Sequence, residues 1–87
     1  MPTIQMYNSS FCPYCMMASQ LLKAKGASVE ILTVDGNTDL RAQMQARSGR
    51  TSVPQIFIGD KHVGGCDDLH ALERSGQLDS LLCADPA

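Results

Sequence analysis

The chain has 87 residues, 44% of them hydrophobic, and a formal net charge of −2. This composition is typical of one small globular domain, which we place at residues 1–87, and it argues against a disordered chain. The sequence has no basic run to indicate a nucleic-acid partner, and no apolar stretch long enough to cross a membrane. It starts with Met1 and lacks the basic and apolar segments of a secretory signal, so we expect a complete chain located in the cytoplasm.

The first segments predict a strand, a helix and a second strand. Ile4 and Met6 alternate with polar neighbours, as in a strand, up to a turn at Asn8-Ser9-Ser10. A helix is expected to begin at Cys12-Pro13, because proline suits the first helical position, and to end at Gly26. Residues 29–34 carry apolar side chains at both odd and even positions, so that both faces of the strand are apolar. This favours an interior parallel strand covered on both faces. The expected apolar stripe of the helix consists of Tyr14, Met17, Ala18, Leu21 and Leu22.

The next segments predict a second helix and a β-hairpin. Asn37 or Thr38 is a candidate cap for a helix that ends at Gly49. Residues 55–58 and 61–63 flank a glycine-containing turn, which is the pattern of a β-hairpin.

The last segments predict two helices. Asp67 or Asp68 can cap a helix that ends near Gly76, and residues 78–82 suggest a short final helix. The order is then β-α-β-α-β-β-α. A strand–helix–strand opening favours parallel pairing, and a closing hairpin must be antiparallel. The sequence therefore predicts an α/β fold with a four-stranded mixed sheet flanked by helices.

The motif Cys12-Pro13-Tyr14-Cys15 is the strongest chemical signal in the sequence. Two thiols three positions apart can lie on one side of a helical turn, where a disulfide can form and open. At a helix N-terminus the Cys12 sulfur would face unpaired N–H groups that stabilise a thiolate. We therefore predict that Cys12 attacks an incoming disulfide and that Cys15 resolves the mixed disulfide.

Packing and metal binding are two alternatives for the cysteine pair. Packing of two small apolar side chains does not account for a proline at the helix start. A structural disulfide framework does not persist in the cytosol, so four cysteines favour redox chemistry or metal. A zinc site needs two further ligands, and no candidate pair repeats a zinc-finger spacing. The sulfur and imidazole candidates are Cys66, Cys83, His62 and His70. We expect no metal site.

Two downstream segments complete the candidate site. Pro54 has no N–H and weakens sheet pairing. Either it begins a strand, or a cis peptide bond leaves the Val53 backbone free to pair with an extended peptide. The N–H groups after Gly65 suit a carboxylate, whereas Asp67 and Asp68 either cap a helix or receive an ammonium group. A ligand that ends in an α-amino acid would suit both features.

These three segments, in this order, resemble the glutaredoxin family, whose members have a thioredoxin-like fold. The resemblance runs from Cys12-Pro13-Tyr14-Cys15 through residues 48–58 to Gly64-Gly65-Cys66-Asp67-Asp68, and it is greatest to the short bacterial-type dithiol members. It implies a cis Pro54 and a glutathione groove beside Cys12. The residues that it implies for glutathione binding are Tyr14, Arg41, Ser52, Val53, Pro54, Gly65, Cys66, Asp67 and Asp68.

The resemblance implies a glutathione-dependent thiol–disulfide oxidoreductase that reduces protein disulfides and glutathione mixed disulfides. Glutathione would be a co-substrate, with no permanently bound cofactor. The partners would be protein disulfides and glutathionylated proteins, ribonucleotide reductase among the candidates, and we expect a monomer. One alternative is an iron–sulfur carrier that binds a [2Fe–2S] cluster with glutathione, against which the stiff Pro13 argues. Another is a thioredoxin-like reductase served by a flavoprotein, against which the absence of Trp argues.

Three positions leave questions open. Arg41 either faces the glycine carboxylate of glutathione, as the resemblance implies, or lies on a solvated helix face. Cys66 is either a reactive thiol beside the ligand or a small buried residue. Family members commonly carry a lysine shortly before the first active cysteine, and residues 8–11 supply none. The Cys12 thiolate would then depend more on the helix terminus.

Overall fold

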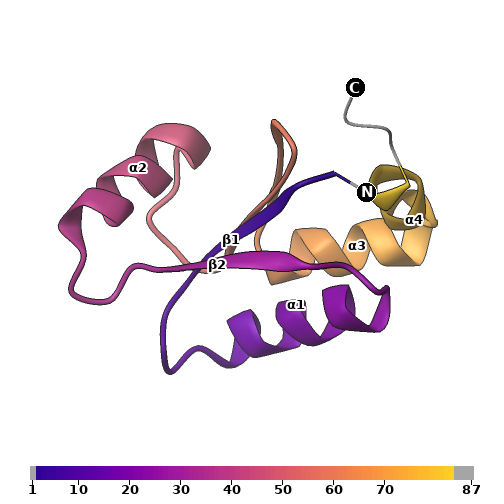
Figure 1. Ribbon diagram of the computed structural model, residues 1–87, viewed down its shortest axis with the longest axis horizontal. Coiled ribbons are helices and arrows are strands. Elements are labelled where there is room, and N and C mark those ends of the chain that lie inside the picture. The colour runs from indigo at the N-terminus through magenta and orange to yellow at the C-terminus, as the bar shows by residue number, and fades with distance from the viewer. Residues whose placement is uncertain (1, 84–87) are drawn as a thin grey trace.

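The computed structural model describes residues 2–83, which form four strands and four helices (Figure 1). In chain order these are β1 (Ile4–Asn8), α1 (Pro13–Ala24), β2 (Val29–Thr33), α2 (Thr38–Ser48), β3 (Gln55–Ile58), β4 (Lys61–Gly64), α3 (Cys66–Ser75) and α4 (Gln77–Leu82). The first seven elements follow the predicted order β-α-β-α-β-β-α, and α4 is the short final helix expected after them. None of the helices within residues 2–83 has the length and apolar character to span a bilayer.

The strands form one mixed sheet in the order β2-β1-β3-β4. β1 pairs in parallel with β2 and antiparallel with β3, and β3 pairs antiparallel with β4. Ile4 of β1 lies between Val29 and Ile58, so the first strand of the chain is central in the sheet. The predicted four-stranded mixed sheet is confirmed.

Helices cover both faces of the sheet, with α1 and α3 on one side and α2 on the other (Figure 1). The larger core lies between the sheet, α1, α3 and α4, and includes Ile4, Met6, Ala18, Leu22, Ile56, Leu69 and Leu78. A smaller core under α2 consists of Tyr7, Val34, Met44 and Phe57. The larger core holds α1 and α3 on the same face of the sheet.

The buried face of α1 differs from the predicted stripe. Ala18 and Leu22 are buried as expected, but Tyr14 and Met17 are 58% and 49% exposed, and Cys15 is buried instead. Positions 15, 18 and 22 follow the helical period, so Cys15, Ala18 and Leu22 form the face of α1 that packs against the core. Tyr14 is thereby left at the surface next to the cysteine pair.

The predicted interior position of the second strand is wrong, because β2 is an edge strand. Most of its residues are exposed. Val29 nevertheless packs against the larger core, while Leu32 packs against the smaller core on the opposite face. Helices thus contact both faces even at the edge of the sheet, and this explains the apolar residues at both parities.

The helix caps agree with the sequence in one case and differ in the other. Asn37 caps α2, because its side chain accepts the N–H three residues further on at 3.0 Å. α3 begins at Cys66 with Gly65 at the N-cap position, so neither Asp67 nor Asp68 is the N-cap residue. The Asp68 carboxylate instead accepts the Gly65 N–H at 2.9 Å from within the helix. The glycine turn is thereby tied to the first turn of α3.

Candidate functional site

Cys12 occupies the N-cap position of α1, and Pro13 is the first helical residue. The Cys12 side chain is only 9% exposed. Its Sγ accepts a hydrogen bond from the backbone N–H of Cys15 at 3.2 Å. An N-cap sulfur takes the place of the oxygen of a serine or aspartate cap, and it faces the positive end of the helix dipole. The predicted position of the first cysteine is confirmed.

Cys15 lies one turn further along α1 and is 2% exposed. Burial, together with a side-chain hydrogen bond to Cys12, raises the pKa of the Cys15 thiol to about 12. A backbone hydrogen bond from Ser9 acts in the opposite direction on this pKa. Cys15 is therefore protonated at neutral pH, and its deprotonation has to accompany any attack by its sulfur.

The Val53–Pro54 segment faces the cysteine pair. Its peptide bond is cis, as the resemblance implies. The Val53 carbonyl oxygen lies 3.9 Å from the Cys12 Sγ, the outer limit for a hydrogen bond of a thiol. The loop before β3 and the N-terminus of α1 are therefore in contact, although 41 positions separate the two residues.

A groove of about 210 Å³ lies between this loop, α1 and the N-terminus of α3. Eight of the predicted ligand-binding residues line it: Tyr14, Ser52, Val53, Pro54, Gly65, Cys66, Asp67 and Asp68. Arg50 and Gln55 also line it, and sequence reasoning missed both. Arg41 does not belong to this lining; it is an exposed residue of α2, and its contact with a ligand stays a prediction.

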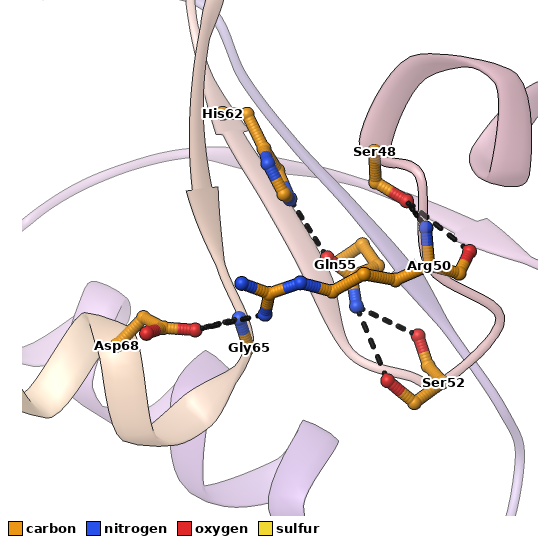
Figure 2. A network of polar contacts seen from close by, with 7 residues as sticks. All are labelled: Ser48, Arg50, Ser52, Gln55, His62, Gly65 and Asp68. Carbon is orange, nitrogen blue, oxygen red and sulfur yellow. Dashed lines mark hydrogen bonds and ion pairs between the residues drawn. The ribbon is translucent and has the colours of Figure 1, made fainter.

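Asp68 joins two sides of the groove (Figure 2). Its Oδ2 accepts the Gly65 N–H at 2.9 Å and the Nη1 of Arg50 at 3.1 Å. The hydrogen bond from Gly65 and the one from Arg50 lower the pKa of this carboxyl group. Asp68 is therefore ionised at neutral pH. The ion pair with Arg50 links the loop that follows α2 to α3.

Gln55 supports the floor of the groove from inside the sheet (Figure 2). It is fully buried, and its Nε2 donates to the carbonyl oxygen of Ser52 at 2.9 Å. Its Oε1 lies 2.8 Å from Nε2 of His62 on β4. A buried amide needs such partners, so this network fixes the loop that carries Val53. The available sequence signal was a single polar residue at the start of the apolar run 55–58.

The segment before Cys12 is held by Asp35. The Ser9 hydroxyl donates to one carboxylate oxygen and the Ser10 N–H donates to the other, each at 2.7 Å. These hydrogen bonds lower the pKa of Asp35, the bond from Ser9 most of all. Ser9 therefore anchors the segment that precedes the first cysteine to the turn that follows β2.

The remaining cysteines lie in different surroundings. Cys66 is buried at the start of α3, with its Sγ 3.4 Å from Nδ1 of His70, and burial raises the pKa of its thiol. Cys83 is exposed at the end of α4. In the described part of the chain, residues 2–83, no three His, Cys, Asp or Glu side chains gather in a way that could hold a metal ion.

A cysteine pair at the head of α1, a proline loop facing it and a sheet of order β2-β1-β3-β4 together define a class of protein. This class is the thiol–disulfide oxidoreductases with a thioredoxin-like fold. Residues 4–63 match the family model described as Glutaredoxin. The chain belongs to the glutaredoxin family.

Individual relatives agree with this assignment. The chain is 54% identical over 84 residues to a glutaredoxin from Pseudomonas aeruginosa, a match that covers 97% of this chain and 100% of the relative. The solution structure of glutaredoxin from Brucella melitensis has a TM-score of 0.83 and 54% identity, covering 94% and 89% of the two chains. A buckwheat glutaredoxin–glutathione complex has a TM-score of 0.85 and 30% identity, covering 93% and 76%.

Proposed function

We propose that this oxidoreductase depends on glutathione and reduces both glutathione mixed disulfides and protein disulfides. The observation that carries the proposal is the groove beside Cys12. It combines the Val53 backbone, the carboxylates of Asp67 and Asp68, and the backbone at the start of α3. The buckwheat relative of similar fold has been solved as a complex with glutathione.

Glutathione has chemical groups that suit this groove. Its cysteinyl backbone can pair with Val53, whose carbonyl oxygen lies beside the Cys12 sulfur. Its γ-glutamyl end carries an ammonium group for the acidic side chains and a carboxylate for the N-terminus of α3. Tyr14 is exposed at the rim, where its ring can cover the tripeptide.

On a glutathionylated protein the Cys12 thiolate attacks the glutathione sulfur. The disulfide breaks, the protein sulfur leaves and takes up a proton, and Cys12 becomes bonded to glutathione. A second glutathione thiolate then attacks that sulfur, which releases glutathione disulfide and restores Cys12. This route requires no thiol from Cys15.

On a protein disulfide Cys12 attacks one sulfur and stays bonded to the substrate. Cys15 then loses its proton and attacks the Cys12 sulfur, which releases the reduced protein and leaves a Cys12–Cys15 disulfide. Two glutathione molecules reduce this disulfide and become glutathione disulfide. The buried, protonated state of Cys15 keeps it from competing with Cys12 for the first attack.

The proposal extends to the cellular setting. A cytoplasmic location would supply the reduced glutathione that the cycle consumes. Protein disulfides would be the macromolecular substrates, and ribonucleotide reductase is one candidate. Tyr14, Ser52, Pro54, Gly65, Cys66 and the more distant Arg41 complete the proposed glutathione-binding set, and we propose that the protein acts as a monomer.

The test compares two reducing systems on the same disulfide substrate. We expect turnover with glutathione and glutathione reductase, and little turnover with thioredoxin reductase alone. The Cys12→Ser variant is expected to be inactive in both systems. Cys83→Ser is the matched control, because its thiol is exposed and does not line the groove. Turnover only with thioredoxin reductase would overturn the dependence on glutathione.

A further inference from the structure

The segment that joins β1 to α1 is tied to Asp35 at two successive residues. Oδ1 of Asp35 accepts the hydroxyl of Ser9, and Oδ2 accepts the N–H of Ser10, both at 2.7 Å. Just before them, the carbonyl oxygen of Asn8 accepts the N–H of Val34 at 2.9 Å. Because both carboxylate oxygens are used and hydrogen bonds to an ionised group are strong, the position of this segment is fixed.

The backbone of Ser9 contacts the second cysteine. A hydrogen bond from this backbone reaches the Cys15 sulfur and lowers the pKa of the thiol, which only an N–H donor does. Ser9, Ser10 and Cys15 also line one hollow of about 270 Å³. Among the described residues, this hollow shares no lining residue with the groove beside Cys12. Ser9 therefore contacts Asp35 through its hydroxyl and Cys15 through its backbone.

The N–H of Ser9 matters most when Cys15 carries a negative charge. At 2% exposure the sulfur has little contact with water, so its thiolate depends on donors of the protein. An N–H binds a thiolate more strongly than a neutral thiol, and this contact strengthens as the proton leaves. Such a donor is effective only while it is held in place, and the carboxylate of Asp35 holds it.

We propose that Asp35 is a positioning residue for the resolving step, which holds the Ser9 N–H against the Cys15 sulfur. In this step the proton of Cys15 passes to solvent water, and the thiolate attacks the Cys12 sulfur. The Cys12–Cys15 bond forms, the bond from Cys12 to the substrate breaks, and the substrate sulfur leaves with the electron pair. The first attack, by Cys12, does not use this contact. The inference rests on the proposed function, because it assumes that Cys15 is the resolving thiol.

A chromophoric disulfide separates the two attacks without any glutathione. With dithiobis(nitrobenzoate), the attack by Cys12 releases one thionitrobenzoate, and the attack by Cys15 on the mixed disulfide releases a second one. Stopped-flow absorbance follows both phases. All variants carry Cys83→Ser, which removes the exposed thiol. Adding Cys15→Ser identifies the resolving phase, because that phase should then disappear.

Asp35→Asn should slow the second phase by about tenfold and leave the first phase within about twofold. Asparagine keeps one acceptor oxygen, so one of the two hydrogen bonds is lost. The sign of the effect distinguishes positioning from charge, since removal of a negative charge alone favours a thiolate and would speed this phase. Asp39→Asn, an exposed change in the first turn of α2, is the matched control and should alter neither phase.

A second pair of variants tests the same contact from the other side. Ser9→Ala removes the hydroxyl that binds Asp35 and should slow only the second phase, by about threefold. Ser9→Thr keeps a hydroxyl and should restore the rate. Thermal unfolding of each variant checks the fold.

An unchanged or faster second phase in Asp35→Asn would overturn the role of Asp35. Equal slowing of both phases would overturn it as well, since the segment would then be loosened as a whole. A Ser9→Thr variant as slow as Ser9→Ala would show that the hydroxyl contact is not what holds the N–H. If the natural protein shows no second phase, the resolving role of Cys15 fails, and with it the proposed route for protein disulfides.

Discussion

The backbone N–H of Cys15 donates to the sulfur of Cys12 over 3.2 Å, so the second cysteine helps to stabilise the first before any chemistry occurs. This amide is fixed by the helix and does not depend on the Cys15 side chain. The Cys15 thiol is a separate element, buried and held in its protonated form. Backbone and side chain of one residue thus serve two different steps of the proposed cycle.

Replacing Cys15 with Ser should separate the two proposed reactions. The backbone N–H that contacts Cys12 remains, so removal of glutathione from a glutathionylated peptide should stay within about threefold of the natural rate. Reduction of a protein disulfide that needs a resolving thiol should fall by at least about a hundredfold. Both activities are measured by coupling to glutathione reductase. Equal loss of both activities would contradict the assigned roles.

The stability of the reduced protein should fall at alkaline pH because of Cys15. Its pKa is raised to about 12 in the folded state by burial and by the hydrogen bond to Cys12. Below the lower pKa of the unfolded chain, both states hold the proton and the contribution is constant. Above it the unfolded chain loses the proton first, so stability decreases as pH rises toward 12.

Urea unfolding of the reduced protein and of Cys15→Ser, from neutral pH to about pH 10.5, measures this effect. The free energy of unfolding should decline more steeply for the natural protein than for the variant. The difference between the two cancels the titration of groups that do not interact with Cys15. Parallel curves would show that Cys15 titrates alike in the folded and unfolded states.

A Ser9→Lys substitution should increase the fraction of Cys12 present as thiolate at neutral pH, because it adds a positive charge just before that residue. The effect should be moderate, since Asp35 now binds Ser9 and would pair with the new ammonium group. Adding Asp35→Asn should enlarge it. Ultraviolet absorbance of the thiolate during a pH titration measures the change, with Ser9→Gln as the uncharged control. Identical titrations for Ser9→Lys and Ser9→Gln would contradict this account.

Gly64→Ala should strongly destabilise the protein and weaken the groove. Gly64 has φ of +114°, and a Cβ there would lie 2.8 Å from Cγ of Asp68. We expect a loss of about 2–4 kcal/mol in the free energy of unfolding, from backbone strain and the clash together. Gly59→Ala is the matched control, because Gly59 has φ of +60° with open space around it. There the free energy of unfolding should fall by only about 1 kcal/mol. Similar losses at both positions would mean that Asp68 moves aside easily.

Much of the fold followed from local signals in the sequence. Pro13 and Gly49 mark helix ends by their backbone geometry. The alternation of Ile4 and Met6 with polar neighbours marks one strand, and the short apolar run after Gln55 marks another. Such signals act within a few residues, so they do not need the rest of the chain. The sequence pattern wrongly predicted an interior position for β2, which is an edge strand. Apolar residues at both odd and even positions indicate that helices cover both faces of a strand, and an edge strand can also be covered in this way.

The sequence by itself determined the chemistry of the site: a cysteine pair at a helix start, a proline segment and an acidic helix N-terminus. Only the tertiary structure decided how these parts meet. It buried Cys15, left Tyr14 exposed and brought Arg50 against Asp68, which lies 18 positions away. It also joined Ser9 to Asp35 and Gln55 to Ser52. The reason is physical, since the reach of a guanidinium or an amide depends on how helices pack across the sheet, and no local pattern records that packing.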